Sequence, residues 1–175
     1  TRILSSAASD VYKRQVGATI SGSVSVANAN LMDAKTTGVI TATITETDLD
    51  TLATGAGILT DANANNVYTI TVDKQTEEDA DPATTTLNET ISAANLNTLN
   101  GLTAGVITVT APTISGTYAD VTTAFNANTA LTIQGLDDKA VTLTDPAGIT
   151  QAEALLAQDF SSGVLTATIS TGDVT

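Results

Sequence analysis

The sequence predicts an α/β fold, built as a solenoid-like stack of short parallel strands linked by short helices. Three segments align without a gap, each with a polar helical stretch followed by a strand, and they begin at Val24, Ile91 and Ile149. Strands recur roughly every 24–40 residues, and strands separated by helices favour parallel pairing with right-handed crossovers. All-β tandem sandwich repeats are the alternative, but they need hairpin signals between strands, of which the sequence has few.

Each expected helix begins at a residue suited to cap its N-terminus. The three aligned copies carry a hydroxyl residue at this place: Ser25, Ser92 and Thr150. Thr150-Gln-Ala-Glu153 also has the spacing of a capping box. Two further short helices, in "TETDLDTLA" and "GTYADVTTAF", are expected to be capped at Thr47 and Thr117.

Each helix is also expected to bury leucine side chains on one side and to end at a glycine. The leucines assigned to the buried side are Leu96 and Leu99 in the second copy, and Leu155 and Leu156 in the third. One glycine stands just before the strand in each copy: Gly38, Gly105 and Gly163. Because glycine readily adopts the left-handed conformation that ends many helices, we expect these three to be left-handed C-caps.

The strands "VITATI", "VITVTA" and "VLTATI" alternate between apolar and polar residues, which is typical of a half-buried strand. In the first copy one face is expected to hold Ile40, Ala42 and Ile44, and the other Val39, Thr41 and Thr43. The Thr-x-Thr pairs are Thr41/Thr43, Thr69/Thr71, Thr108/Thr110, Thr142/Thr144 and Thr166/Thr168. Stacked in parallel, they would form a ladder that resembles the ice-binding face of some solenoid antifreeze proteins. Threonine is equally a good strand former on any solvated face.

These patterns divide the chain into four parts. Residues 16–90 form a first repeat unit, residues 91–148 a second, and residues 149–175 a truncated third. The strands "VYTITVD" and "KAVTLTD" complete the first two units. An exposed acidic loop at 74–86 lengthens the first unit, so that the starts of the copies are 67 and then 58 residues apart.

The fourth part, residues 1–15, does not match the chain that follows it. Residues 5–15, "SSAASDVYKRQ", resemble a translated transposase adapter of the kind used to make sequencing libraries. We therefore expect residues 1–15 to be a disordered, non-native scar, and the chain to be a metagenomic fragment whose natural ends lie elsewhere. Without this part, three basic residues stand against eighteen acidic ones, a net charge of −15 in place of −13.

Composition argues against several classes of function. An acidic chain has no basic face for the phosphates of nucleic acid or for an anionic membrane. No apolar run approaches the roughly 20 residues of a membrane span. The chain also lacks His and Cys, which supply most general bases, transition-metal ligands and thiol nucleophiles. We expect no enzyme activity, no nucleic-acid partner and no membrane insertion of this fragment.

Calcium is the one cofactor that the acidic residues suggest. Asp137, Asp138 and Asp145 flank the strand "KAVTLTD", and calcium takes six to eight oxygen ligands from loops that can wrap around it. The competing interpretation is solvated charge that caps helix N-termini, and it suits Asp48 and Asp50 well. Apart from this calcium site, the sequence indicates no cofactor.

Two stretches, "ISAANLNTLNGLTAGVITVTA" and "GLDDKAVTLTDPAGITQAEALLAQ", resemble the tandem repeats of very large extracellular proteins of marine bacteria, including cyanobacteria. The resemblance implies a secreted or cell-surface segment with a structural or adhesive role, whose partners are neighbouring repeats and a surface glycan or matrix. The chain lacks the glycine-rich nonapeptide of the calcium-binding modules found in some of these proteins, so their metal sites do not carry over. A calcium- or glycan-binding module and an ice-binding threonine ladder are the alternatives.

Overall fold

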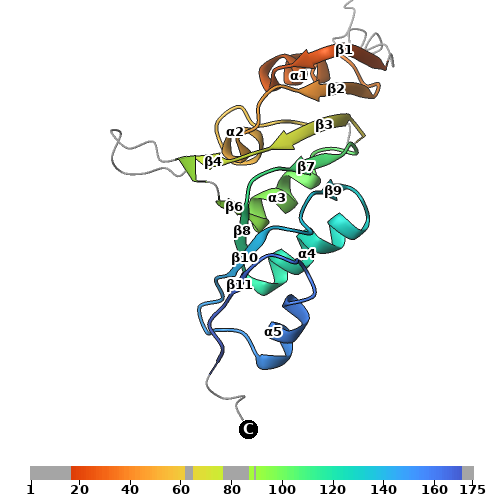
Figure 1. Cartoon of the computed structure of the whole chain (residues 1–175). Coiled ribbons are helices and arrows are strands. Elements are labelled where there is room, and N and C mark those ends of the chain that lie inside the picture. The colour runs from red at the N-terminus through yellow and green to blue at the C-terminus, as the bar shows by residue number, and fades with distance from the viewer. Residues whose placement is uncertain (1–16, 62–64, 77–86, 89, 171–175) are drawn as a thin grey trace, which may run out of the picture.

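The structure is a computed structural model, and it describes residues 17–61, 65–76, 87–88 and 90–170 of the 175-residue chain. The predicted adapter scar and most of the predicted acidic loop therefore lie outside the described residues. The described chain is a mixed α/β fold of short strands and short helices, which confirms the predicted class (Figure 1).

The described helices are α1 (Val26–Asp33), α2 (Leu49–Ala53), α3 (Ala93–Asn100), α4 (Tyr118–Thr129) and α5 (Gln151–Ala157). The first six strands are β1 (Ala18–Val24), β2 (Ile40–Ile44), β3 (Val67–Val72), β4 (Gln75–Thr76), β5 (Leu87–Asn88) and β6 (Thr90–Ser92). The remaining five are β7 (Ile107–Val109), β8 (Thr113–Gly116), β9 (Ile133–Gln134), β10 (Ala140–Leu143) and β11 (Leu165–Thr166).

The strands form two parallel sheets and one small antiparallel pair. The larger sheet has the order β1-β2-β3-β7-β9, the second has the order β6-β8-β10-β11, and β4 pairs with β5. Within each parallel sheet the spatial order follows the chain order, and Figure 1 shows the elements descending in that order from β1 to α5. Helices connect most of these strands, so the all-β sandwich alternative is wrong.

The helix starts follow the predicted capping residues with one exception. The side chains of Ser25, Ser92, Thr117 and Thr150 each accept a hydrogen bond from a backbone N–H in the first turn of their helix. Thr150 also forms the predicted capping box with Glu153, whose carboxylate accepts from the Thr150 N–H at 2.8 Å. The prediction at Thr47 is wrong, because α2 begins one residue later and is capped by the Asp48 carboxylate.

Apolar strand residues and helix residues form one continuous core. The predicted alternation in β2 is confirmed, since Ile40, Ala42 and Ile44 are buried while Thr41 and Thr43 are exposed. The strand β3 contributes Tyr68, Ile70 and Val72 to the same core, and the helices contribute further leucines. This arrangement places the polar residues of the larger sheet on its opposite, outward side.

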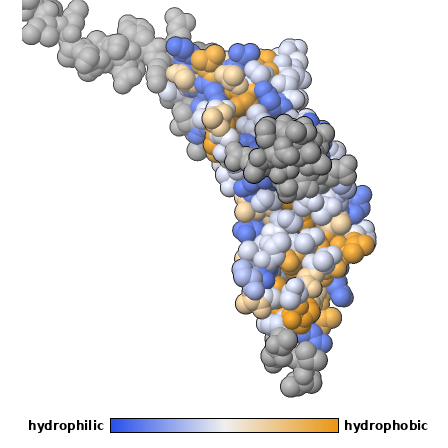
Figure 2. Space-filling model, turned by 90° about the vertical axis from the view of Figure 1, so that its left-hand side faces the viewer, coloured by the Kyte–Doolittle hydropathy of each residue, from blue (hydrophilic) through white to orange (hydrophobic). Residues whose placement is uncertain are grey.

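The leucine prediction holds for α3 and fails for α5. Leu96 and Leu99 are fully buried, but Leu155 and Leu156 are 58% and 57% exposed. In the alignment of the copies, these two leucines occupy the places of Asn97 and Thr98, which are not among the buried residues of α3, and α5 buries Ala157 instead. Figure 2 shows apolar residues reaching the surface in the lower half of the molecule, toward its C-terminal end.

The three glycines before the strands are not left-handed C-caps. None of them has a positive φ, and the helices before them end at Ala34, Gly101 and Gln158 in right-handed helical conformation. Two of the three glycines are needed for a different reason, which is the close approach of neighbouring strands. A Cβ at Gly105 would overlap the Tyr68 carbonyl oxygen, and one at Gly163 would overlap the Lys139 carbonyl oxygen.

Candidate functional site

The outward side of the larger sheet is a surface of threonine and serine. We define the hydroxyl face as the outward side chains of β1, β2, β3 and β7: Thr19, Ser23, Thr41, Thr43, Thr69, Thr71 and Thr108. All are exposed except Thr108, which is half-buried. All-parallel sheets are almost always covered on both faces, so an open, hydroxyl-bearing face on such a sheet is unusual.

Strand pairing aligns these side chains into short ranks across the sheet. One rank joins Ser23, Thr43 and Thr69, and a second joins Thr71 and Thr108 to Gln134 of β9. The predicted threonine ladder therefore exists, but only in part, because Thr41 pairs with Thr19 of β1 on one side and with Val67 of β3 on the other. The second sheet has its own rank, which runs through Ser92, Ser115, Thr142 and Thr166.

Charge is excluded from the strands of both sheets. The chain is 14% charged and carries a formal net charge of −13, yet no residue within the described strands is charged. The acidic residues lie in helices and in the connections between elements. The two sheets therefore present neutral surfaces on a protein that is otherwise strongly acidic.

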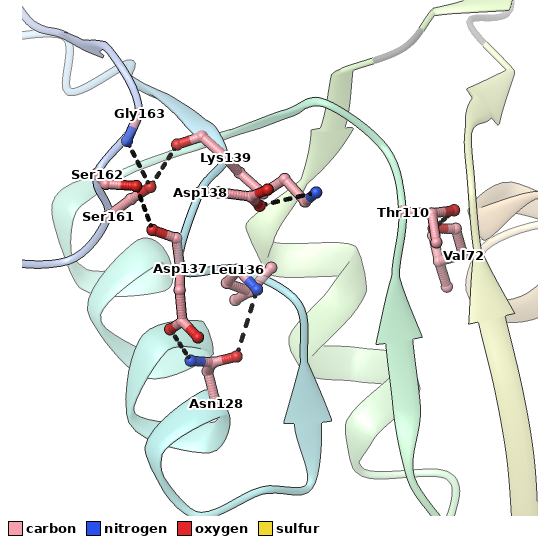
Figure 3. Close-up of polar contacts among 10 residues, drawn as sticks. All are labelled: Val72, Thr110, Asn128, Leu136, Asp137, Asp138, Lys139, Ser161, Ser162 and Gly163. Carbon is pink, nitrogen blue, oxygen red and sulfur yellow. Dashed lines mark hydrogen bonds and ion pairs between the residues drawn. The ribbon is translucent and has the colours of Figure 1, made fainter.

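In the second and third copies, a hydroxyl just before the strand binds the backbone of the neighbouring strand where the two approach closely. The Thr103 hydroxyl accepts hydrogen bonds from the Tyr68 N–H at 2.8 Å and the Gly105 N–H at 2.9 Å, and donates to the Tyr68 carbonyl at 3.1 Å. Ser161 repeats this pattern, donating to the Lys139 carbonyl at 2.7 Å and accepting from the Gly163 N–H at 3.0 Å (Figure 3).

This hydroxyl–glycine contact was not predicted from the sequence, although the sequence contains a pattern that indicates it. Each aligned copy has a hydroxyl residue two places before the glycine: Thr36, Thr103 and Ser161. In the first copy the Thr36 hydroxyl accepts from the Gly38 N–H at 2.9 Å, as in the other two. The Thr/Ser-x-Gly triplet thus precedes the strand in each copy, and its hydroxyl accepts a hydrogen bond from the glycine N–H.

A buried polar cluster lies between α1 and β3. Asn66 is fully buried, donates to the Asp33 carboxylate at 2.7 Å, and accepts from the Ile40 N–H at 2.8 Å. The neighbouring Tyr68 hydroxyl is buried without a hydrogen-bond partner in the described chain. Burial, together with the carboxylates of Asp33 and Asp61, raises the pKa of Tyr68 to about 12. We assign this cluster a structural role.

The three aspartates proposed for calcium each have a partner within the chain. Asp137 accepts from the Asn128 amide at 2.7 Å (Figure 3), and Asp145 accepts from the N–H of Tyr118 at the start of α4 at 2.8 Å. Asp138 forms an ion pair with Lys139 at 2.9 Å, whose hydrogen bond and charge lower the pKa of Asp138.

No group of three or more acidic side chains that could hold a metal ion occurs among the described residues. A depression of about 210 Å³ lies beside Asp137 and Asp159, but it brings neither Asp138 nor Asp145 to its wall. Calcium binding by this chain remains a prediction, and unchanged thermal unfolding on addition of Ca²⁺ would contradict it.

Comparisons of this chain with protein-family models, with curated proteins and with solved structures give no match. In the described part of the chain, no helix has the length and apolar character needed to cross a membrane.

Proposed function

We propose that this chain is a non-enzymatic structural and adhesive repeat segment of a secreted or cell-surface bacterial protein, built as a solenoid-like stack. The observation that carries the proposal is the serial pairing of strands in chain order within both parallel sheets. Repeats that contact only their neighbours make an array that lengthens by addition of further units. The neutral sheet faces supply a continuous surface along such an array.

Contacts from the helices to the segments that follow them support this serial design. Asn30 of α1 donates to the Ile58 carbonyl at 2.7 Å, and Asn97 at the equivalent place in α3 donates to the Asp120 carbonyl of α4 at 2.9 Å. Each asparagine thus binds the segment that follows it in the stack. Leu155 holds the same place in α5 and is 58% exposed, so α5 presents an apolar surface where the earlier helices contact their successors.

Duplicating one unit tests the repeat design directly. A second copy of residues 91–148, inserted after Gly148, keeps the aligned order of the copies. We expect both the free energy of unfolding and the urea m-value to rise, because a longer stack adds an interface and buries more surface. The control inserts the same 58 residues in shuffled order. Two separate unfolding transitions, or no gain over the parent, would contradict the repeat design.

The surface role needs a test at the level of the source DNA. Long-read sequencing of the locus should place Val16 after further copies of the same pattern, in a reading frame that carries a secretion signal. A short frame closed at both ends, without such a signal, would exclude the secreted or cell-surface assignment.

A further inference from the structure

We propose that the hydroxyl face binds ice. The inference deepens the proposed adhesive role and rests on it, since it names the kind of surface to which this segment would adhere. It is carried by three properties of the face: its regular geometry, its neutrality and its uncommitted hydroxyl groups.

The geometry of the face is that of a two-dimensional grid across β2, β3 and β7, which β1 joins with a shift of register between Thr19 and Ser23. Paired strands lie about 4.8 Å apart, and alternate residues along one strand are about 6.7 Å apart. The pairs Thr41/Thr43 and Thr69/Thr71 place side chains at such points on the adjacent strands β2 and β3. Because threonine is branched at Cβ, its χ1 is restricted, and its methyl and hydroxyl groups are held in a repeated orientation. Side chains with this even spacing make the most contacts with a partner whose own atoms are evenly spaced.

The hydroxyl groups of the face are available to an outside partner. Thr41, Thr43, Thr69, Thr71 and Thr108 make no side-chain hydrogen bond to the described chain. Other outward threonines differ, because the Thr45 hydroxyl donates to Glu46 at 2.9 Å and the Thr110 hydroxyl lies 3.4 Å from the Val72 carbonyl (Figure 3). The threonines at the centre of the face therefore present hydroxyl and methyl groups that are not committed to hydrogen bonds within the described chain.

The chemistry of the face favours ice over a glycan or a second copy of the chain. Sugar rings pack on aromatic side chains, but Tyr68 is buried, and Tyr118, Phe125 and Phe160, which stack on one another, are not part of the hydroxyl face. Stable dimer interfaces have apolar centres, which a field of threonine and serine does not provide. The ordered water of ice requires neither aromatic rings nor an apolar centre. It matches a neutral surface of alternating methyl and hydroxyl groups.

The size of the face limits the expected effect. Its ranks are three side chains long, and Val67 interrupts the alignment of Thr41. We therefore expect adsorption to ice and inhibition of recrystallisation, with only a small depression of the freezing point.

The experiment measures partition of the full chain, labelled at its N-terminal amine, into slowly grown ice. The test variant Thr43→Lys/Thr69→Lys places two cations at the centre of the face, and Thr41→Lys/Thr71→Lys places one in each of the two flanking ranks. The control, Thr51→Lys/Thr123→Lys, makes the same charge change at exposed positions of α2 and α4. Far-UV circular dichroism confirms that each variant is folded.

We expect enrichment of the parent and of the control in ice, and exclusion of the folded face variants to the level of serum albumin. Exclusion of the parent, or equal enrichment of all variants, would overturn the inference. Binding to insoluble chitin or cellulose in place of ice would overturn it as well, while leaving an adhesive role intact. If the duplicated chain gains stability and ice binding is absent, only the ice inference fails. If the duplicated chain gains no stability either, the proposal of a repeat segment fails as well.

Discussion

Replacing Gly105 with alanine tests whether neighbouring strands are held at backbone contact. A Cβ at this position would overlap the Tyr68 carbonyl oxygen and lie 2.8 Å from the Tyr68 amide nitrogen. Both atoms belong to the backbone of a buried strand, so no side chain can rotate away. The backbone segments at Gly105 and Tyr68 must separate by roughly 1 Å to restore ordinary van der Waals distance.

The magnitude follows from the contacts that such a separation would break. The Thr103 hydroxyl accepts from the Tyr68 N–H at 2.8 Å and donates to the Tyr68 carbonyl at 3.1 Å. Each of these bonds contributes about 1 kcal/mol net, and steric strain in a packed core costs about 1–3 kcal/mol. We expect Gly105→Ala to lower the free energy of unfolding by about 3–5 kcal/mol, a large part of the stability of an ordinary domain.

Urea denaturation followed by circular dichroism measures this loss as a lower midpoint at an unchanged m-value. The matched control is Gly101→Ala at the end of α3, where φ is −75° and an added Cβ would come no closer than 3.3 Å to the Thr98 carbonyl oxygen. This change should be neutral or stabilising by up to about 1 kcal/mol. If Gly105→Ala stays within about 0.5 kcal/mol of the parent, the close-approach argument is refuted.

Three other substitutions test the remaining features of the fold. Thr103→Val leaves two buried N–H groups without their acceptor and should cost about 2–3 kcal/mol in urea titration, whereas Thr103→Ser should recover most of this; equal losses would contradict the hydrogen-bond role. The pKa of Tyr68 is higher in the folded chain than its ordinary value of 10.0. The contribution of neutral Tyr68 to the free energy of unfolding is therefore complete below pH 10 and is lost as the pH rises toward 12. Tyr68→Phe should remove this alkaline loss without weakening the fold at pH 7, and an unchanged pH profile would argue against it. Leu131 has a left-handed φ of 63° and is 64% exposed, so Leu131→Gly should raise stability by about 1 kcal/mol, which a lower melting temperature in calorimetry would contradict.

Local rules in the sequence predicted the helix starts and the strand faces well. Ser25, Ser92, Thr117 and Thr150 were identified because a cap depends on residues within one turn. The alternation of β2 was equally readable, since one residue step reverses the face of a strand. Both kinds of information are contained in fewer than ten consecutive residues.

The failures concern interactions between segments far apart in the chain. Gly105 was interpreted as a helix end because its partner, Tyr68, lies 37 residues earlier and cannot be inferred from local conformation. Leu155 and Leu156 were placed in the core by hydropathy, although the side of a short helix that is buried depends on its neighbours. The arrangement of strands in two sheets likewise follows from pairing and not from any local pattern.

The spacing of paired residues shows which parts of the stack are constrained. Paired residues are 22 and then 20 positions apart between β1 and β2, on the two sides of a register shift, 26 between β2 and β3, and 37 between β3 and β7. Parallel pairing survives these differences because the connecting helices and loops absorb them at the surface. The strand starts at Gly105 and Gly163 have no such freedom, since the hydroxyl two residues earlier binds the backbone of the neighbouring strand and a Cβ on the glycine would overlap it. The connections can therefore vary while these two Thr/Ser-x-Gly triplets are retained.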